Sequence, residues 1–160
     1  MPREYDNTGK VVDAVEQATK VALMAAIIDM HNQATLLASG SVVTGNLMGS
    51  LSWTVGGEHS GVRAPAGATD GVRRTTKTDT AYLGTNVHYG PHVEYGTKPH
   101  TIRAKNAMVL TDGKTFFGKQ VQHPGTQPKS FLRAAYDARK KYTKEIMARH
   151  YKKAIEGVTR

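Results

Sequence analysis

The chain contains no cysteine. This absence excludes disulfide frameworks, thiolate metal sites and cysteine nucleophiles, although it does not identify a compartment. Long hydrophobic runs are also lacking, because the longest, Val21 to Ile28, is closed by Asp29 and is far too short to span a membrane. The chain does not begin with a basic leader followed by an apolar run. We therefore expect a soluble protein with no membrane partner, made in the cytoplasm or carried within a particle.

Acidic residues are scarce near the end of the chain, where the net charge of +9 is concentrated. Residues 1–57 carry 3 basic and 5 acidic side chains, whereas residues 129–160 carry 10 basic and 3 acidic ones, a net charge of +7. The excess thus lies on one segment and not across a groove formed by the whole fold. Such a run is either a solvated helix face or a surface for an anionic partner. The candidate contacts to DNA or an acidic protein are Arg139, Lys140, Lys141, Lys144, Arg149, Lys152 and Lys153.

A long first helix is predicted between about Gly9 and Ser39, where proline and glycine do not interrupt the chain. Apolar residues recur there in steps of four and three, at Leu23, Ile27, Met30, Ala34 and Leu37. At a rise of ~1.5 Å per residue this helix would be about 45 Å long. That is longer than a domain of this size needs for its own core, so we expect part of the apolar stripe to meet another subunit.

The middle of the chain predicts strands and one long loop. Residues 56–78 hold six glycines or prolines and almost nothing large to bury, which predicts a long mobile loop that binds a partner or orders on assembly. Its basic residues Arg63, Arg73 and Arg74 are candidate assembly contacts. A short helical turn at 44–51 precedes these residues, and the expected strands lie at 52–55, 80–89, 101–103, 107–111 and 115–121. Asp112-Gly113 is a hairpin turn signal between the last two strands.

A second helix is predicted from about Ser130 to Glu156, with Ala135, Ala138, Tyr142 and Ile146 on one face and with Phe131 at its start in the core. The order of helix, strands and helix predicts an α+β fold. In it, the long N-terminal helix and the basic C-terminal helix pack on a mainly antiparallel sheet that carries the loop insertion. The length of the chain fits one domain, residues 1–160.

Three motifs occur in order along the chain. They are Thr-Gly-x-Leu-x-x-Ser-Leu at Thr44 to Leu51, Gly-Thr-x-x-x-Tyr-x-x-x-Val-Glu-x-Gly-Thr at Gly84 to Thr97, and Pro-x-x-Phe-Leu-Arg-x-Ala from Pro128. Together with the long first helix, this set resembles the neck, or head–tail joining and tail-completion, proteins of long-tailed bacteriophages. The motifs anchor about the last three quarters of the chain, and the 56–78 segment is longer than the common pattern needs.

The resemblance implies a structural virion protein that forms a homo-oligomeric ring at the head–tail junction, around the channel through which DNA leaves. The implied partners are further copies of the chain, a head-closure (stopper) protein, and a tail-terminator or tail-tube protein, with DNA passing through the lumen. Assembly would take place in the host cytoplasm. The resemblance implies no cofactor and no catalysis.

Independent features of the sequence agree with a structural role. Gly90 and Gly96 flank a short bend that would hold His92, Glu94 and Tyr95 as candidate assembly contacts. The histidines lack the spacing of a metal site, including the set formed by His88, His92, His100, His123 and Glu94. The expected sheet carries only two carboxylates, Glu94 and Asp112, which is too few for a hydrolase, and no phosphate-binding loop is present. We therefore predict neither an enzyme nor a metal protein.

Two hypotheses of different class remain open at this point. The first is the ring-forming virion component, for which the sequence does not separate a neck ring from a tail terminator. The second is a basic DNA-binding packaging accessory protein that uses the cations of the last helix as phosphate contacts. Gene neighbourhood distinguishes them, since portal, capsid and tail-tube genes would support the first and replication genes the second.

Overall fold

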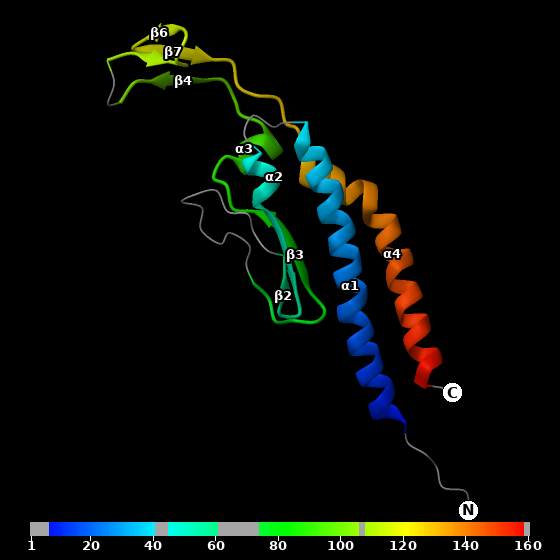
Figure 1. Cartoon of the computed structure of the whole chain (residues 1–160). Coiled ribbons are helices and arrows are strands. Elements are labelled where there is room, and N and C mark those ends of the chain that lie inside the picture. Colours follow the sequence, from blue (N-terminus) through cyan, green and yellow to red (C-terminus); the bar gives the residue numbers. More distant parts are fainter. Residues whose placement is uncertain (1–6, 41–44, 61–73, 106–107, 159–160) are drawn as a thin grey trace, which may run out of the picture. The chain divides into compact units, whose positions relative to one another are not determined.

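The computed structural model describes residues 7–40, 45–60, 74–105 and 108–158 (Figure 1). The chain divides into two compact units: unit 1 comprises the residues up to His88 together with those from Phe131 onward, and unit 2 comprises Tyr89–Ser130. Helices and small antiparallel sheets build an α+β fold, as predicted. That the two units form one domain stays a prediction. No helix within the described ranges is long and apolar enough to cross a membrane.

Unit 1 is built on α1 (Thr8–Ser39), a helix of 32 residues with bounds close to the predicted ones. Its fully covered positions are mostly small: Ala18, Ala22, Ala26, Ile27, Ala34 and Ala38. Alanine has the highest helix propensity and leaves room for a neighbouring backbone to approach closely. The helix α4 (Phe131–Val158) uses this room and runs antiparallel beside α1, so that α1 contacts both α4 and the sheet of the same unit (Figure 1).

The sheet of unit 1 has the strand order β2-β1-β3 and is antiparallel throughout. The short helix α2 (Asn46–Ser50) leads directly into the central strand β1 (Leu51–Val55), which pairs with β2 (Glu58–His59) and β3 (Ala81–Thr85). The register places Trp53 opposite Leu83. Four of the five β1 residues are buried because this strand has a neighbour on each edge and α1 against the sheet.

The predicted loop at 56–78 is in part ordered structure, which corrects the sequence interpretation. Gly56 and Gly57 adopt φ angles of 55° and 86° and form the tight turn between β1 and β2. Their amides donate hydrogen bonds to the carbonyls of Lys77 and Thr75, each at 2.9 Å, so the far end of the segment is held to the sheet as well. Residues 61–73, including Arg63 and Arg73, lie outside the described residues.

The helix α4 begins where the sequence predicted, and Phe131 and Ala135 are fully buried, which confirms them as core residues. The apolar face expected from Ala135, Ala138, Tyr142 and Ile146 is rotated, since Ala138 and Tyr142 are exposed. Arg139 and Thr143 take the inner positions instead. The reason is the pairing with α1, whose Asp29 and Gln33 offer polar partners to a long cationic side chain.

Unit 2 begins with the single helical turn α3 (Gly90–Tyr95), as predicted, and continues into four short strands. The strands are β4 (His100–Arg103), β5 (Leu110–Thr111), β6 (Phe116–Gly118) and β7 (Gln120–His123). They form two separate pairs, β4-β7 and β5-β6. The expectation of one continuous sheet is therefore wrong for the described residues. Gly118, at φ 81°, divides the strand predicted at 115–121 into two.

Two glycines allow the backbone just before β4 and just after β7 to pack closely together. Gly96 and Gly125 have φ angles of 72° and 87°, and they lie beside an isolated bridge between Thr97 and Thr126. A Cβ atom at Gly96 would collide with the Thr126 carbonyl oxygen, and one at Gly125 with the Thr97 carbonyl oxygen. Both the backbone conformation and the close approach therefore require glycine at these two positions.

Candidate assembly and nucleic-acid surfaces

The three sequence motifs supply structural residues. Leu47 and Leu51 of the first motif are buried beneath α1, and Gly45 caps α2 with a φ of 75°. Gly90 and Glu94 of the second motif are buried in unit 2. Phe131 and Ala135 of the third motif are in the core of unit 1. The described residues of the motifs thus contribute to the fold of the two units.

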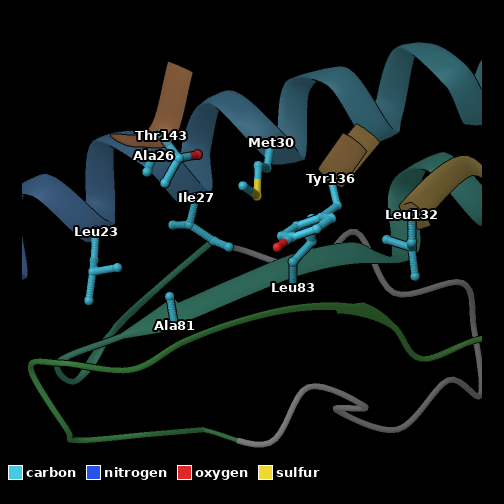
Figure 2. A pocket seen from close by; sticks show the side chains of 9 residues that line it. All are labelled: Leu23, Ala26, Ile27, Met30, Ala81, Leu83, Leu132, Tyr136 and Thr143. Atoms are coloured by element: carbon cyan, nitrogen blue, oxygen red, sulfur yellow. The ribbon is translucent and has the colours of Figure 1, made fainter. Parts of the chain in front are cut away.

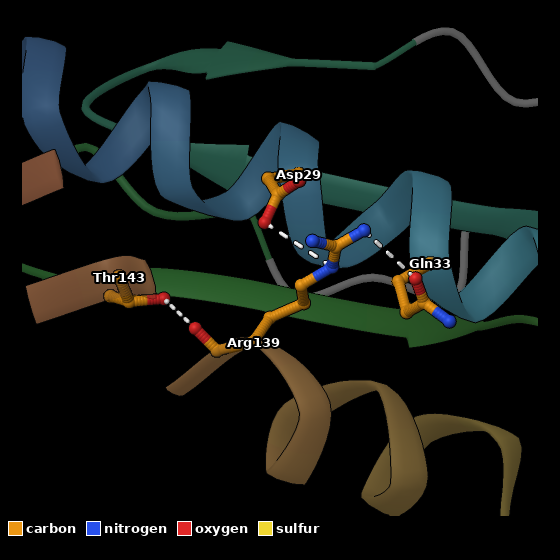
Figure 3. A network of polar contacts seen from close by, with 4 residues as sticks. All are labelled: Asp29, Gln33, Arg139 and Thr143. Atoms are coloured by element: carbon orange, nitrogen blue, oxygen red, sulfur yellow. Dashed lines mark hydrogen bonds and ion pairs between the residues drawn. The ribbon is translucent and has the colours of Figure 1, made fainter. Parts of the chain in front are cut away.

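Arg139 is held inside unit 1 by partners on α1 (Figure 3). Its Nη2 donates a hydrogen bond to Gln33 Oε1 at 3.0 Å, and its Nε lies 3.5 Å from Asp29 Oδ2, which is an ion pair longer than a good hydrogen bond. The Thr143 hydroxyl donates to the Arg139 carbonyl at 3.1 Å. Its guanidinium joins the two long helices while the side chain stays 32% exposed, so a contact of Arg139 with DNA stays a prediction.

The other six predicted cationic contacts on α4 are exposed: Lys140, Lys141, Lys144, Arg149, Lys152 and Lys153. Lys140 donates to Asp137 Oδ1 at 2.8 Å, and this hydrogen bond raises the pKa of the Lys140 ammonium. The Nζ atom of Lys152 lies 3.9 Å from Glu156 Oε1. Lys141, Lys144 and Lys152 are three and eight residues apart, which places them on one side of the helix. We call these exposed cations the basic side of α4, although Asp137 and Glu145 lie among them; that they contact an anion stays a prediction.

Charge reversal tests the basic side of α4. Lys141→Glu with Lys144→Glu is expected to weaken binding to duplex DNA and to reduce the slope of log K against log salt by about 2, since each lost phosphate contact removes about 0.9. The fold should be unchanged, because both side chains are exposed. Fluorescence anisotropy over a salt series measures the slope. The matched control reverses Lys10 and Lys77, two exposed cations elsewhere in unit 1; equal effects of both pairs would contradict a localised surface.

The assembly contacts predicted on α3 are only partly surface residues. His92 and Tyr95 are exposed and stay candidates. Glu94 is 4% exposed, and its backbone carbonyl accepts hydrogen bonds from the amide and the hydroxyl of Ser130, each at 3.3 Å. Glu94 therefore does not present its carboxylate to a partner, which corrects the prediction. Arg74, the described member of the loop cations, is exposed.

Sequence reasoning missed a second apolar face on α1. Val21, Ile28 and Leu36 are 48%, 38% and 66% exposed, and their spacings of seven and eight residues place them on one side of the helix. The side chains that share this side are uncharged: Ala25, Asn32, Thr35 and Ser39. The signal was present in the run from Val21 to Ile28, which is apolar all round, a pattern typical of a helix covered on every side. Among the described residues of unit 1, α1 has its contacts with α4, with the sheet and with the short helix α2.

Metal-ligating clusters are not found on the described part of the chain. No group of three or more His, Asp or Glu side chains there is close enough to hold a metal ion. His100 and His123 are cross-strand partners in β4 and β7, with ring centroids 5.0 Å apart. The Nδ1 atom of His123 accepts the Gly125 amide at 3.0 Å, and His100 Nδ1 lies 2.8 Å from the Lys98 carbonyl, so both rings are used in the turns beside them.

Comparisons of the chain with protein-family models, with curated proteins and with solved structures gave no match. The resemblance to phage neck proteins therefore depends on the three motifs and the long first helix. The function that this resemblance implies is therefore a proposal.

Proposed function

We propose that this chain is a structural virion protein that forms a homo-oligomeric ring at the head–tail junction of a tailed phage. The observation that carries the proposal is the apolar side of α1, which no other part of the described chain buries. Each of its three large side chains is about half exposed, so covering one would contribute about 1 kcal/mol. An uncharged helix side about four turns long is a surface that a repeated subunit contact would bury.

The remaining surfaces fit the partners of such a ring. The exposed basic side of α4 is suited to DNA passing through the lumen or to an acidic neighbour. The candidates His92, Tyr95 and Arg74 are exposed, which would suit contact with a head-closure, tail-terminator or tail-tube protein. In this proposal the chain acts by presenting surfaces and has no catalytic step.

A DNA-binding packaging accessory protein is the second candidate, and the exposed lysines of α4 favour it. A tail terminator is a third, since it would use the same ring architecture. The accessory protein differs from both because it has no need of the apolar side of α1. Self-association through that side is therefore the property that separates the two classes.

We expect the purified chain to form a closed homo-oligomer, and we expect Ile28→Asp with Leu36→Asp to convert it to a monomer. Burying two carboxylates in an apolar contact would cost several kcal/mol of the association free energy, because the charged groups lose their hydration. Light scattering after size exclusion measures the mass. Val12→Asp is the matched control, because Val12 is also half exposed on α1 but lies on another side of it. A wild-type monomer, an open series of aggregates or a two-fold dimer would contradict the proposal.

A further inference from the structure

The open apolar hollow of unit 1 lacks the cationic side chains that bind an anion. It has a volume of about 350 Å³ and lies between α1, β3 and α4 (Figure 2). Leu23, Met30 and Leu83 are among its lining residues, and none of the residues that line it is charged. The positive charge of the chain lies elsewhere, on the basic side of α4 and on unit 2.

Unit 2 is the second concentration of positive charge in the chain. It carries six cations against two carboxylates, a net charge of +4. Of the two carboxylates, Glu94 is buried, and Asp112 accepts two backbone amides of the hairpin turn. All six cations are exposed: Lys98, Arg103, Lys105, Lys114, Lys119 and Lys129. The surface of unit 2 therefore suits a partner with dense negative charge.

The strands β4 and β7 form a two-stranded ribbon with one polar face (Figure 1). The register pairs Thr101 with Gln122, and it pairs Arg103 with Gln120. Residues directly opposite each other in an antiparallel pair share a face, and so do residues two apart on one strand. All four side chains are exposed. Together, Thr101, Arg103, Gln120 and Gln122 form the polar ribbon face.

Both faces of the ribbon contribute to its order. On the opposite face, Ile102 and Val121 are paired across the two strands and are half-buried. On the polar ribbon face, the Thr101 hydroxyl donates a hydrogen bond to Gln122 Oε1 at 2.9 Å. This bond orients the Gln122 amide, and its Nε2 donors take no part in it. The polar ribbon face is thus partly organised before a ligand binds, which reduces the entropy cost of binding.

The side chains of the polar ribbon face are those that contact base edges in the major groove of DNA. Arginine makes paired hydrogen bonds to guanine, glutamine makes them to adenine, and threonine contacts either base. The major groove is about 12 Å wide and admits a two-stranded ribbon. Side chains two apart on a strand are separated by about 6.8 Å, which equals two base-pair steps of about 3.4 Å. The face therefore fits the edges of about three base pairs.

We infer that unit 2 binds duplex DNA, with the polar ribbon face in the major groove and exposed lysines on the phosphates. Lys105 follows β4 by two residues and Lys119 directly precedes β7, so both stand at one end of the ribbon. Lys98 precedes β4 by two residues and stands at the other end. The inference does not rest on the proposed ring, because a single subunit presents the whole surface. It adds a second DNA contact to the one expected for the basic side of α4.

An anionic lipid surface is the competing partner of unit 2. Phe116 and Phe117 in the hairpin formed by β5 and β6 are 76% and 45% exposed, and a lipid interface would bury such rings. The polar ribbon face decides between the two partners. Its hydrogen-bonding groups match the donors and acceptors of base edges, whereas an acyl layer offers them no partner.

Wild-type protein and two duplexes test the contact with the bases. One is a fluorescein-labelled duplex of mixed sequence. In the other, 7-deazaguanine and 7-deazaadenine replace the purines, which removes the N7 acceptors of the major groove and keeps every phosphate. Fluorescence anisotropy is expected to show binding to the deaza duplex that is at least about fivefold weaker, because a lost hydrogen bond costs about that factor. Equal affinity for the two duplexes, or binding to neither, would overturn the inference.

A pair of substitutions locates the contact on the ribbon. Arg103→Ala with Gln120→Ala should bind the unmodified duplex at least about tenfold more weakly and should no longer distinguish the two duplexes. The matched control is Lys77→Ala with Gln17→Ala, which removes one cation and one amide from exposed positions of unit 1. The control should keep the preference of the wild type. Circular dichroism verifies the fold of both variants, and equal losses from both pairs would contradict a contact on the ribbon.

Two further measurements separate the inference from its alternatives. Binding to vesicles of equal phosphatidylcholine and phosphatidylglycerol, without binding to either duplex, would assign unit 2 to a lipid surface and overturn the inference. An oligomer in light scattering whose DNA affinity is unchanged by Arg103→Ala with Gln120→Ala would also overturn it and leave the ring. A monomer that prefers the unmodified duplex would support the inference and contradict the ring.

Discussion

Replacing Phe131 by alanine is expected to lower the free energy of unfolding by about 3–5 kcal/mol. Phe131 is fully buried at the first position of α4, in the core of unit 1. Removing its ring would leave a cavity that the surrounding long helices cannot close without losing their own packing. For a chain of this length the thermal midpoint should fall by about 6–20 °C. Circular dichroism at the helical minimum measures this change.

The sequence offers a matched control for this substitution. Phe116→Ala removes the same atoms from a side chain that is 76% exposed, and in dilute protein it should change stability by no more than about 0.5 kcal/mol. Equal midpoints for Phe131→Ala and the wild type would show that the core does not depend on the junction at the start of α4. A large loss from Phe116→Ala in the monomer would show that the hairpin is already covered within one chain.

The helices were predictable because the signals that define them are local. Residues 9–39 and 130–156 were predicted, and α1 and α4 occupy Thr8–Ser39 and Phe131–Val158. In both stretches a helical repeat continues over several turns without proline. The short helix α3 was also predictable, because glycines stand at both of its ends.

The sheets were less predictable because strand pairing depends on residues far apart in the chain. The sequence predicted one antiparallel sheet, whereas the described strands belong to three. Gly118 interrupts a stretch that the sequence predicts as one strand. The periodicity of the sequence does not indicate that this glycine has a positive φ. The Gly56-Gly57 turn lies at the start of the loop that the sequence predicts. Two adjacent glycines after a strand are, however, also a hairpin signal.

For two candidate contacts, burial and partners that the sequence does not show decide the environment of the residue. Arg139 appeared to belong to a run of exposed cations, but its hydrogen-bond partner Gln33 is 106 positions away in the sequence. Glu94 stood on a predicted bend, and only the fold shows that it is buried. The exposed apolar side of α1 is hard to predict for a different reason: the helical stripe from Leu23 to Leu37 already explains many of the apolar residues, so periodicity does not single out a second side.

Loss of the gene is expected to have the largest effect of all, because a junction ring has no substitute once head and tail are complete. A phage that encodes this chain and loses it should make DNA-filled heads and morphologically normal tails that do not join. Infectious yield should fall to background. In the proposed role the chain supplies contact surfaces, so it is needed where two finished parts must be held together.

Electron microscopy of lysates from such a deletion tests the central claim most directly. The predicted result is separate full heads and separate tails, with joining restored when purified wild-type protein is added to the lysate. Protein carrying Ile28→Asp and Leu36→Asp should fail to restore it, whereas protein carrying Val12→Asp should succeed. Empty heads, absent genome replication, or normal joined virions in the deletion lysate would contradict a ring at the head–tail junction.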